Sequence, residues 1–451
     1  MIELTLSSFG GKGDGAFDNT SVFKTALDKL KSSGGGKLVV EEGVWRVGAI
    51  DLFSDTELHI QKGAVLSFIE DAMIYEPVYT RWEGVDCYAM HSLIRAEGQT
   101  NVSITGEGII EGNGSYWWNL RNEKRAKGQK EPKEEYEKRL ASLNPGFEAQ
   151  PGGGGGRENQ FLRPCLVEFS KCSDVTIEGV TFRNSPFWTI HPLYSSWVRL
   201  RNVTIENPAD APNTDGIDID SCTNVVIEGC TVSVGDDGIC LKSGSGESGI
   251  KAAKPTENVL VKNCTVKNAH GGIVIGSETA AGIRHVLAEN SFFPQTDRGI
   301  RIKSRRGRGG EIFDIQLRNL EMSDNLCPIA INMFYKCGIT DVNSPLFSLD
   351  AQPITEETPY IHDVTIDGVK AVRCKASAGF IAGLKERAID NLVIRNCAFS
   401  TDESSEKSPM ESDMFYGLPE VKAKSFRVIN APNATFENVT ITGPKEVFIY
   451  E

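Results

Sequence analysis

A short pattern of alternating apolar and polar residues recurs along most of the chain. Each copy predicts one strand, a turn at Asn or Gly and a second strand, as at residues 174–182, 197–205, 224–232, 258–266 and 391–399. One apolar slot of this pattern holds Val175, Val198, Val225, Val259, Val286 and Ile315, which are 23 to 34 residues apart. Internal repeats of about 20–50 residues are typical of solenoids, propellers and arrays.

The pattern favours an all-β fold, a parallel β-helix. Strands of period two with little helical periodicity predict coils that bury their aliphatic side chains on the coils above and below. Asn and Gly at the corners suit turns that need a positive φ or a side-chain hydrogen bond to the backbone. A propeller, which has more regular blades of about 40 residues, is the second choice.

Residues 19–34 predict one amphipathic helix near the start of the chain. Phe23, Ala26, Leu27 and Leu30 fall on one face, and Gly34 follows the last turn. Because a solenoid needs its open end covered, we expect this helix to cap the N-terminal end.

Residues 119–159 interrupt the repeats with a charged stretch at 121–138 and the glycine-rich run 151–156. One interpretation is a solvated surface insertion with a short helix and a flexible tip. The other is a loop that closes one end of a cleft, together with the nearby aromatic and basic residues Tyr79, Arg81, Trp82, Trp117 and Trp118. We find no linker between independent domains. The sequence therefore predicts a single domain over residues 1–451, with an insertion at about 76–165 that forms loops beside the cleft.

Four polar clusters follow the same spacing between residues 213 and 308. They are Asn213-Thr214-Asp215, Gly235-Asp236-Asp237, His270-Gly271-Gly272 and Arg301-Ile302-Lys303, and the strands beside them begin at Gly216, Gly238, Gly272 and Gly299. Neighbouring parallel strands lie about 4.8 Å apart. Aligning the glycines therefore predicts one file of side chains across the stack, in the order Asp215, Asp236 with Asp237, His270, and Arg301 with Lys303.

The three carboxylates of this file predict acid–base chemistry. Clustered carboxylates repel each other, so we expect at least one of their pKa values to be raised. A protonated carboxylic acid beside an ionised carboxylate suits glycoside hydrolysis, in which one group protonates the glycosidic oxygen and the other activates water. Single Asp residues at turns more often cap backbone N–H groups, and clustered Asp residues also bind calcium. The adjacent histidine and cations argue against calcium, and we expect no metal and no cofactor.

The net charge of −13 makes a nucleic-acid binder improbable, because phosphate binding needs a basic surface. An acidic substrate would be repelled by the molecule as a whole and would need a local basic patch. Such a patch lies within 11 residues, at Arg298, Arg301, Lys303, Arg305, Arg306 and Arg308. Arginine presents a planar fork that suits sugar carboxylates; the alternative is a solvated basic turn.

The eleven cysteines are scattered through apolar strand patterns and predict buried, reduced thiols. The chain has no apolar run of about 18 residues that could span a membrane, and its first residues carry no basic and apolar leader. We therefore expect a cytoplasmic protein with no membrane partner, or a secreted or periplasmic one if a signal peptide was removed.

The motifs N-T-D at 213–215, G-D-D at 235–237, H-G-G at 270–272 and R-I-K at 301–303 resemble those of the polygalacturonases, glycoside hydrolase family 28. The resemblance covers nearly the whole chain and includes F-G-G-K-G-D-G-A-F-D-N-T from Phe9, W-E-G-V-D-C from Trp82 and S-P-F-W-T-I-H-P from Ser185. The chain departs from it at Ala269, where many members have glycine, and at Gly238, where many have cysteine. Both residues are small, so neither departure puts the chemistry in doubt.

The resemblance implies a right-handed parallel β-helix and metal-independent, inverting hydrolysis of α-1,4-galacturonosyl linkages in pectic polygalacturonate or oligogalacturonides. It assigns Asp236 as the general acid, Asp215 and Asp237 as the pair that activates water, and His270 as the group that tunes the acid. The residues that it implies for binding the substrate are Arg301 and Lys303, with Asn213 and Arg298 beside them. A separation of one strand is closer to the spacing in retaining enzymes, but it ignores side-chain direction, so we follow the family on the outcome.

The forms H-G-G-I-V-I-G-S-E and D-R-G-I-R-I-K-S-R-R-G-R-G-G, with the early insertion, are more similar to the bacterial exo-acting members, so we expect exo action. Arg81 and His191 are further candidate sugar contacts, with core packing or a surface role as alternatives. A rhamnogalacturonan or other modified-pectin hydrolase stays open. So do a calcium-dependent pectate lyase and a non-catalytic carbohydrate-binding β-helix. The oligomeric state is unknown from the sequence.

Overall fold

The computed structural model describes residues 2–150, 154–339, 341–412 and 414–451. The chain divides into two compact units. Unit 1 comprises residues 1–82, 86–150 and 155–235, and unit 2 comprises residues 83–85, 151–154 and 236–451. The prediction of a single domain stays a prediction, and residues 151–153 of the glycine-rich run lie outside the described residues.

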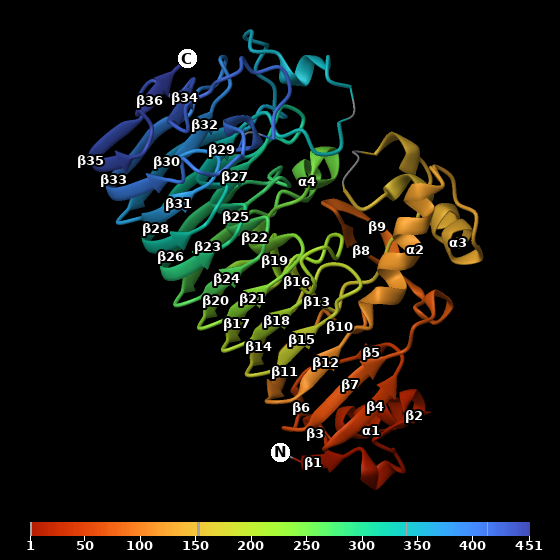
Figure 1. Ribbon diagram of the computed structural model, residues 1–451. Coiled ribbons are helices and arrows are strands. Elements are labelled where there is room, and N and C mark those ends of the chain that lie inside the picture. Colours follow the sequence, from red (N-terminus) through yellow and green to blue (C-terminus); the bar gives the residue numbers. More distant parts are fainter. Residues whose placement is uncertain (1, 151–153, 340, 413) are drawn as a thin grey trace. The chain divides into compact units, whose positions relative to one another are not determined.

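Unit 1 consists of coils that each contribute up to three short parallel strands (Figure 1). The first series of strands is β5 (Ile50–Asp51), β10 (Ile94–Glu97), β13 (Val167–Ser170), β16 (Ile190–Leu193) and β19 (Ile217–Asp220). The second is β1 (Ile2–Thr5), β3 (Gly36–Val40), β6 (Thr56–Ile60), β11 (Thr100–Gly106), β14 (Ser173–Glu178), β17 (Ser196–Arg201) and β20 (Thr223–Glu228). The third is β2 (Asp14–Asp18), β4 (Gly43–Val47), β7 (Ala64–Phe68), β12 (Ile109–Glu111), β15 (Thr181–Arg183), β18 (Thr204–Glu206) and β21 (Thr231–Ser233).

Unit 2 repeats the plan, with some strands that continue through a corner of the coil. Its first series is β22 (Asp237–Lys242), β25 (Gly271–Ile275), β27 (Arg298–Lys303), β29 (Cys327–Asn332), β32 (Gly379–Ala382), β34 (Phe426–Ile429) and β36 (Phe448–Tyr450). The other strands are β23 (Thr256–Lys262), β24 (Thr265–Lys267), β26 (Ile283–Pro294), β28 (Glu311–Ser323), β30 (Tyr360–Asp367), β31 (Lys370–Cys374), β33 (Asp390–Thr401) and β35 (Thr435–Thr442).

Equivalent positions of the sequence repeat pair with each other in neighbouring coils. Val175 pairs with Val198 and Val198 with Val225, while Val259 pairs with Val286 and Val286 with Ile315. All six side chains are buried, so each stacks on its equivalent in the next coil. The corner residues Asn202, Asn224 and Asn258 have φ values of 52°, 59° and 58°, a region that asparagine tolerates better than most residues. The predicted parallel β-helix is confirmed.

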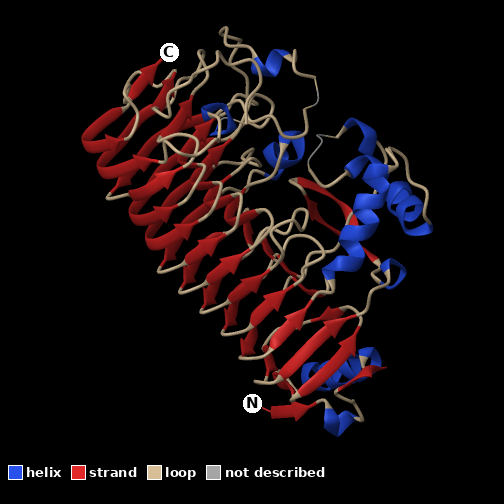
Figure 2. Cartoon of the chain, viewed as in Figure 1, coloured by secondary structure: helices blue, strands red, loops and turns tan. Residues whose placement is uncertain are grey.

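Helices are few, as Figure 2 shows. Helix α1 (Thr20–Ser32) buries Phe23, Ala26, Leu27 and Leu30 and contacts β1, β3, β4 and β5, so the predicted N-terminal cap is confirmed. The other helices are α2 (Gly114–Ala126), α3 (Glu135–Leu143) and α4 (Gly246–Ala252), with short 3-10 turns at Ser7–Phe9, Ala72–Ile74, Phe147–Ala149, Arg157–Asn159, Pro345–Phe347 and Pro409–Ser412. Among the described residues, none of the helices has the length and apolar character needed to span a membrane.

The segment 76–165, expected to be an insertion, combines two kinds of structure. Strands β8 (Pro77–Trp82) and β9 (Val85–Met90) pair as a separate two-stranded sheet, and α2 and α3 follow later in the segment. Between them, β10, β11 and β12 belong to the regular coils of unit 1. The segment therefore adds a strand pair and two helices to the coils without replacing a coil.

Candidate active site

The register of β22, β25 and β27 aligns the predicted residues of unit 2. Asp237 pairs with Gly271 and Gly271 with Arg298, while Ile239, Ile273 and Ile300 follow in the same register. Gly238, Gly272 and Gly299 are therefore neighbours across the three strands, as the glycine alignment predicted. Asp237 begins β22, and His270 directly precedes β25.

Asp237 is buried and neutralised by two cations from β27. Its Oδ1 accepts a hydrogen bond from Nη1 of Arg301, and its Oδ2 lies 2.6 Å from Nζ of Lys303. Strand β25 lies between β22, which carries Asp237, and β27, which carries the two cations. The β25 residue that pairs with Asp237 is Gly271. A Cβ there would lie 2.3 Å from Cγ2 of Val274 and 3.2 Å from Cδ of Arg301. Glycine at position 271 therefore allows Arg301 to reach across a strand to Asp237.

Asp236 is partly exposed and binds His270 on the next coil. Its Oδ1 lies 3.2 Å from Nδ1 of His270 and accepts a hydrogen bond of 3.0 Å from the Asp237 amide. Its backbone carbonyl accepts the His270 amide at 2.8 Å. The His270 side chain is 47% exposed. Asp236 and His270 thus form the solvent-facing part of this cluster, and Asp237 the buried part.

The pKa values of both carboxylates lie below their usual range. Burial by itself raises the pKa of Asp237, but Arg301 and Lys303 lower it by more. Burial also raises the pKa of Asp236, and the hydrogen bond and charge of His270 lower it by more. The expectation of a raised carboxylate pKa is therefore wrong for these two residues in the free protein. The spacing of the acids predicts their mutual repulsion, but it does not locate the cations that outweigh this repulsion.

His270 shows the reciprocal effect. Burial lowers its pKa, and the hydrogen bond and negative charge of Asp236 raise it by more, so that the pKa lies above the ordinary histidine value. This pair stabilises the fold at pH values below the unfolded histidine pKa, and the contribution is lost as the pH rises through the folded pKa.

We expect the Asp236→Asn variant to lower the pKa of His270, because it removes the charge that favours the imidazolium. An NMR titration of the His270 ring in wild type and variant measures this shift directly. Asp314→Asn, which removes an exposed carboxylate elsewhere in unit 2, should leave the His270 titration unchanged. An unchanged His270 titration in Asp236→Asn would show that the pair does not couple.

Arg298 lies on β27 but is bound mainly by a different segment. Its Nη2 donates to the Glu411 carbonyl at 2.5 Å, and its Nη1 lies 3.5 Å from Oδ2 of Asp297. Burial and the nearby charge of Arg301 lower its pKa. The predicted substrate contact is neither supported nor opposed by these interactions.

Tyr335, which the sequence analysis did not select, lies against both cations of β27. Its ring centroid is 5.6 Å from the Arg301 guanidinium carbon and 5.0 Å from Nζ of Lys303. It follows β29 in the run N-M-F-Y, outside the repeat pattern, so no periodic signal marked it. Its phenol provides a polar group beside the predicted carboxylate-binding cations.

Asp215 and Asn213 belong to unit 1, just before β19. Asp215 is buried, and its backbone carbonyl accepts the Thr189 amide at 2.9 Å. Asn213 has a φ of 56°, and its Oδ1 accepts a hydrogen bond of 2.9 Å from Nη2 of Arg163. Arg163 is fully buried and also donates to the Pro186 and Pro212 carbonyls. Arg163 holds the turn that carries Asn213 and Asp215, and no motif or repeat of the sequence marked it for this role.

Arg81 and His191 are buried and bound by other side chains of unit 1. Arg81 is buried, with Nη1 2.8 Å from Oδ1 of Asp220 and Nε 2.9 Å from Oδ1 of Asp86, and its guanidinium also binds Tyr194. His191 is fully buried, and its Nε2 lies 3.7 Å from Oδ2 of Asp220. The predicted sugar contact is corrected for both residues, because their polar groups are already bound inside unit 1.

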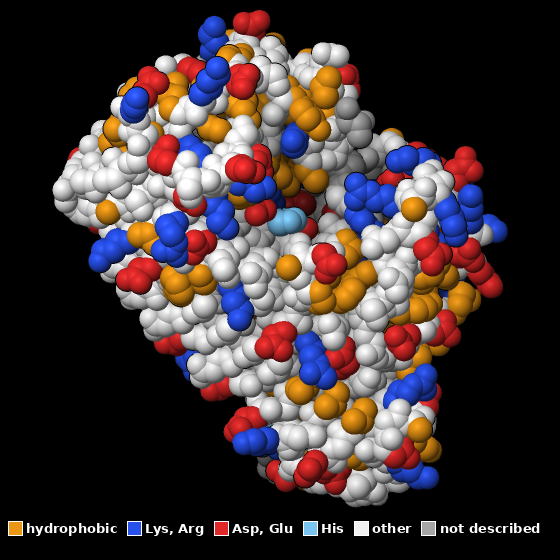
Figure 3. Space-filling view, viewed as in Figure 1, with side chains coloured by type: hydrophobic (Ala, Val, Ile, Leu, Met, Phe, Trp, Pro, Cys, Tyr) orange, Lys and Arg blue, Asp and Glu red, His pale blue; other side chains and the backbone are white. Residues whose placement is uncertain are grey.

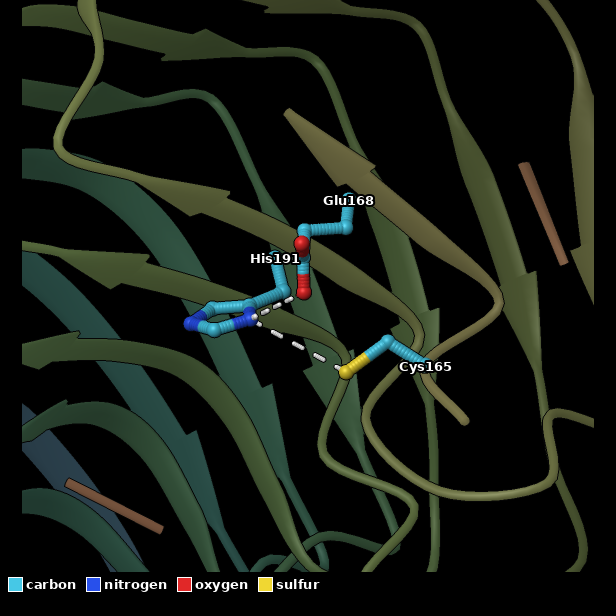
Figure 4. Close-up of side chains that lie close together, drawn as sticks. All are labelled: Cys165, Glu168 and His191. Carbon is cyan, nitrogen blue, oxygen red and sulfur yellow. Dashed lines mark hydrogen bonds and ion pairs between the residues drawn. The ribbon is translucent and has the colours of Figure 1, made fainter. Parts of the chain in front are cut away.

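The other side of His191 faces a carboxylate and a thiol (Figure 4). Its Nδ1 lies 3.8 Å from Oε2 of Glu168 and 3.9 Å from Sγ of Cys165. These atoms could ligate a metal ion only if the imidazole and the thiol lost their protons. Burial raises the pKa of Cys165 to about 11, and the His191 pKa is raised by Asp220, Cys165 and Glu168 against the effect of burial. The imidazole of His191 thus lies between two carboxylates, those of Glu168 and Asp220, which raise its pKa.

These groups form a buried chain of alternating charge across the first series of unit 1. Its members are Arg95, Glu168, His191, Asp220, Arg81 and Asp86. Thr80 also donates to Glu168 at 2.7 Å, and Arg95 donates to the Tyr79 carbonyl at 3.2 Å. Strand β8 is thus held against the strands that carry Arg95, Glu168, His191 and Asp220.

Residues 152–404, more than half of the chain, match the profile described as "Glycosyl hydrolases family 28". The chain belongs to this family. Among curated relatives, a "Probable polygalacturonase" of Vitis vinifera is 34% identical over 70% of this chain and 60% of its own length. An "Exo-poly-alpha-D-galacturonosidase" of Dickeya chrysanthemi is 30% identical over 71% of this chain and 55% of its own length. The chain thus spans less than two thirds of the length of these two relatives.

A solved exopolygalacturonase structure matches along nearly the whole chain. The exopolygalacturonase of Thermotoga maritima is 30% identical and gives a TM-score of 0.76, covering 98% of this chain and 92% of that one. The family 28 exopolygalacturonase of Yersinia enterocolitica, at 23% identity and a TM-score of 0.73, supports the fold alone. The right-handed parallel β-helix implied by the sequence resemblance is confirmed.

Proposed function

We propose that this family 28 protein is an exo-acting polygalacturonase. It hydrolyses α-1,4-galacturonosyl linkages of polygalacturonate or oligogalacturonides, and it inverts the anomeric centre. The observation that carries the proposal is the pair of adjacent carboxylates at the start of β22. One is buried and ion-paired to β27, and the other is partly exposed and bound to a histidine. Two carboxylates in different environments are what acid–base glycoside hydrolysis needs.

Asp236 is the proposed general acid, because its carboxylate is the accessible one and His270 can adjust its protonation. Its lowered pKa keeps the carboxyl ionised in the free protein, so substrate binding must favour its protonation before it can act as an acid. A bound galacturonate brings a negative charge, which disfavours an ionised Asp236 and therefore raises its pKa. Asp237, held ionised by Arg301 and Lys303, suits the role of a base.

The substrate class follows from charge as well as from family. Basic and acidic side chains are interspersed on the face drawn in Figure 3, and the net charge is −13. A local concentration of cations is therefore needed to hold a polyanion, and β27 with the turn after it provides one. An acidic pectic chain fits this arrangement better than a neutral polysaccharide.

Strand β8 covers part of the first series of strands in unit 1. Tyr79, Thr80 and Arg81 bind residues of the first series, so this stretch of its surface is not open to a polymer chain. Exo action is proposed because both of the proteins described above at 30% identity are named as exo-acting enzymes.

The test is incubation with trigalacturonate in EDTA, with products followed by chromatography and by absorbance of unsaturated uronates. Early release of monogalacturonate without absorbance is the expected result. Cleavage only of rhamnogalacturonan fragments would move the substrate and keep the catalytic groups. Cleavage that needs calcium and produces absorbance would indicate a lyase and contradict the proposal, as would retention of intact oligomer by a folded protein.

A further inference from the structure

The cations between residues 298 and 308 differ in whether the protein neutralises them. Arg301 and Lys303 share Asp237. Arg306 makes two contacts with Glu386, at 2.6 and 2.8 Å, and binds the carbonyls of the segment that contains Leu346 and Ser348. Glu386 therefore neutralises Arg306, which is a structural clamp, whereas Arg301 and Lys303 share a single carboxylate.

Arg305 has no such match. Only 6% of the residue is exposed, and the structure shows one side-chain hydrogen bond, of 3.1 Å, from Nη1 to the Arg306 carbonyl. Its Nε is buried without an acceptor. No carboxylate within the described part of the chain forms an ion pair with it. Buried arginines are nearly always paired, so this guanidinium needs an explanation.

The surroundings of Arg305 add positive charge. Burial lowers its pKa to about 10, and the neighbouring charge of Arg308, which is also buried, contributes to the decrease. Glu278 is the nearby acid, and its charge already faces Lys242 at 3.3 Å as well as Arg308 and Lys303. One glutamate is thus shared among several cations, and the cluster keeps an excess of positive charge.

An uncompensated buried cation destabilises a folded protein, because its hydration is lost without a partner. A binding site is a place where such a charge is kept, since the ligand supplies the missing anion. Guanidinium and carboxylate are both planar and pair through two parallel hydrogen bonds. The ligand chemistry that fits Arg305 is therefore a sugar carboxylate, and a neutral hexose lacks the required group.

We propose that Arg305 binds a galacturonate carboxylate, in an anion pocket that also includes Arg308 and is separate from the Arg301–Lys303 pair. This proposal rests on the proposed function, because it names the group that recognises the acidic substrate. Arg301 and Lys303 must divide their charge between Asp237 and the substrate, whereas Arg305 has its whole charge available. Arg305 is thus a specificity-determining residue for a uronate over a neutral sugar.

Calorimetric titration with D-galacturonate and with D-galactose tests the pocket without turnover. Wild type should bind galacturonate more tightly than galactose, and Arg305→Gln should weaken galacturonate binding at least tenfold. Arg305→Lys should fall between them, because it keeps the charge and loses the fork. Arg373→Gln is the charge-matched control, since Arg373 is an exposed unit 2 arginine paired with Asp324. It should bind like wild type.

Kinetics on trigalacturonate and the melting temperature separate binding from a structural role. In Arg305→Gln we expect KM to rise about tenfold or more with kcat within about threefold, as for a contact made equally in ground and transition states. The Tm should stay the same or rise, because an unpaired buried charge is removed. A fall of Tm and kcat together, or unchanged galacturonate binding, would overturn the pocket.

The same experiments separate this proposal from the proposed function. Hydrolysis by wild type with no effect of Arg305→Gln would keep the function and remove the pocket. Arg305-dependent galacturonate binding without hydrolysis would keep the pocket and remove the function. Absence of both in folded wild type would remove both.

Discussion

Replacing Asp236 by Asn is expected to lower kcat on trigalacturonate by about 10³-fold while the protein stays folded. The amide keeps the size of the side chain but cannot donate a proton to the glycosidic oxygen, and general acid–base catalysis contributes about 10²–10⁴-fold. Asp236 is partly exposed, so its replacement leaves no uncompensated charge in the core. Initial rates at saturating substrate measure the effect, and circular dichroism and Tm measure the fold.

The control for this variant is Asp314→Asn, which makes the same chemical change at an exposed carboxylate paired with His285. It should retain wild-type activity. If Asp236→Asn kept more than about a tenth of the wild-type kcat, the loss would be smaller than the contribution of about 100-fold or more expected of a general acid. Asp236 would then not be the acid. A loss of activity together with a large fall in Tm would assign the residue to stability instead.

Replacing Arg81 by Met is expected to lower the free energy of unfolding by about 3–5 kcal/mol at pH 7. The change leaves Asp220, which is fully buried, without its closest cation, and breaking one partner of a buried ion pair costs about this much. Methionine keeps much of the apolar volume, so the effect reports the lost charge. Urea unfolding followed by intrinsic fluorescence measures it.

The pH dependence of this effect has a defined sign. Burial raises the pKa of Asp220, but Arg81 and His191 lower it by more, so that the net pKa lies well below the usual range. A carboxylate with a lowered pKa stabilises the fold above the unfolded pKa of about 4, and the contribution is lost as the pH falls through the folded pKa. The difference between Arg81→Met and wild type should therefore shrink as the pH falls below about 4.

Two further variants make the test specific to the buried charge. Arg199→Met removes a half-exposed arginine paired with Asp174 in the same unit and should cost less than about 1 kcal/mol. Adding Asp220→Asn to Arg81→Met should recover part of the loss, since the stranded charge is removed as well. If Arg199→Met and Arg81→Met were equally mild, the charge chain would not stabilise unit 1.

Most of the fold could be predicted from the sequence because a solenoid repeats local contacts. Each aliphatic residue at the slot of Val175, Val198 and Val259 needs only its equivalent in the next coil, so the period determines the register. Helix α1 was predictable for a similar reason, since the residues of its apolar face all lie within a few turns of the same helix. The β8–β9 pair and the helices α2 and α3 were less predictable, because their contacts depend on residues distant in sequence and have no period.

The candidate site divides in the same way. The alignment of Gly238, Gly272 and Gly299 followed from the repeat, and it placed Asp236, Asp237, His270, Arg301 and Lys303 in one cluster of unit 2. The ionisation of those residues did not follow from it. Asp237 has a lowered pKa because Arg301 crosses a glycine to reach it, and spacing along the chain does not specify the direction of a long side chain.

The sequence by itself determined the coil, its register and the set of polar residues that the register brings together. Only the tertiary structure decided which charges are neutralised. It buried Arg81 and His191 in a chain of ion pairs and paired Arg306 with Glu386. Among the residues that the structure describes, it left Arg305 without a carboxylate partner. The physical reason is the range of the interactions. Strand pairing follows a short repeat that can be counted along the chain, whereas the partner of a buried charge is set by the three-dimensional packing of segments up to about 140 residues apart.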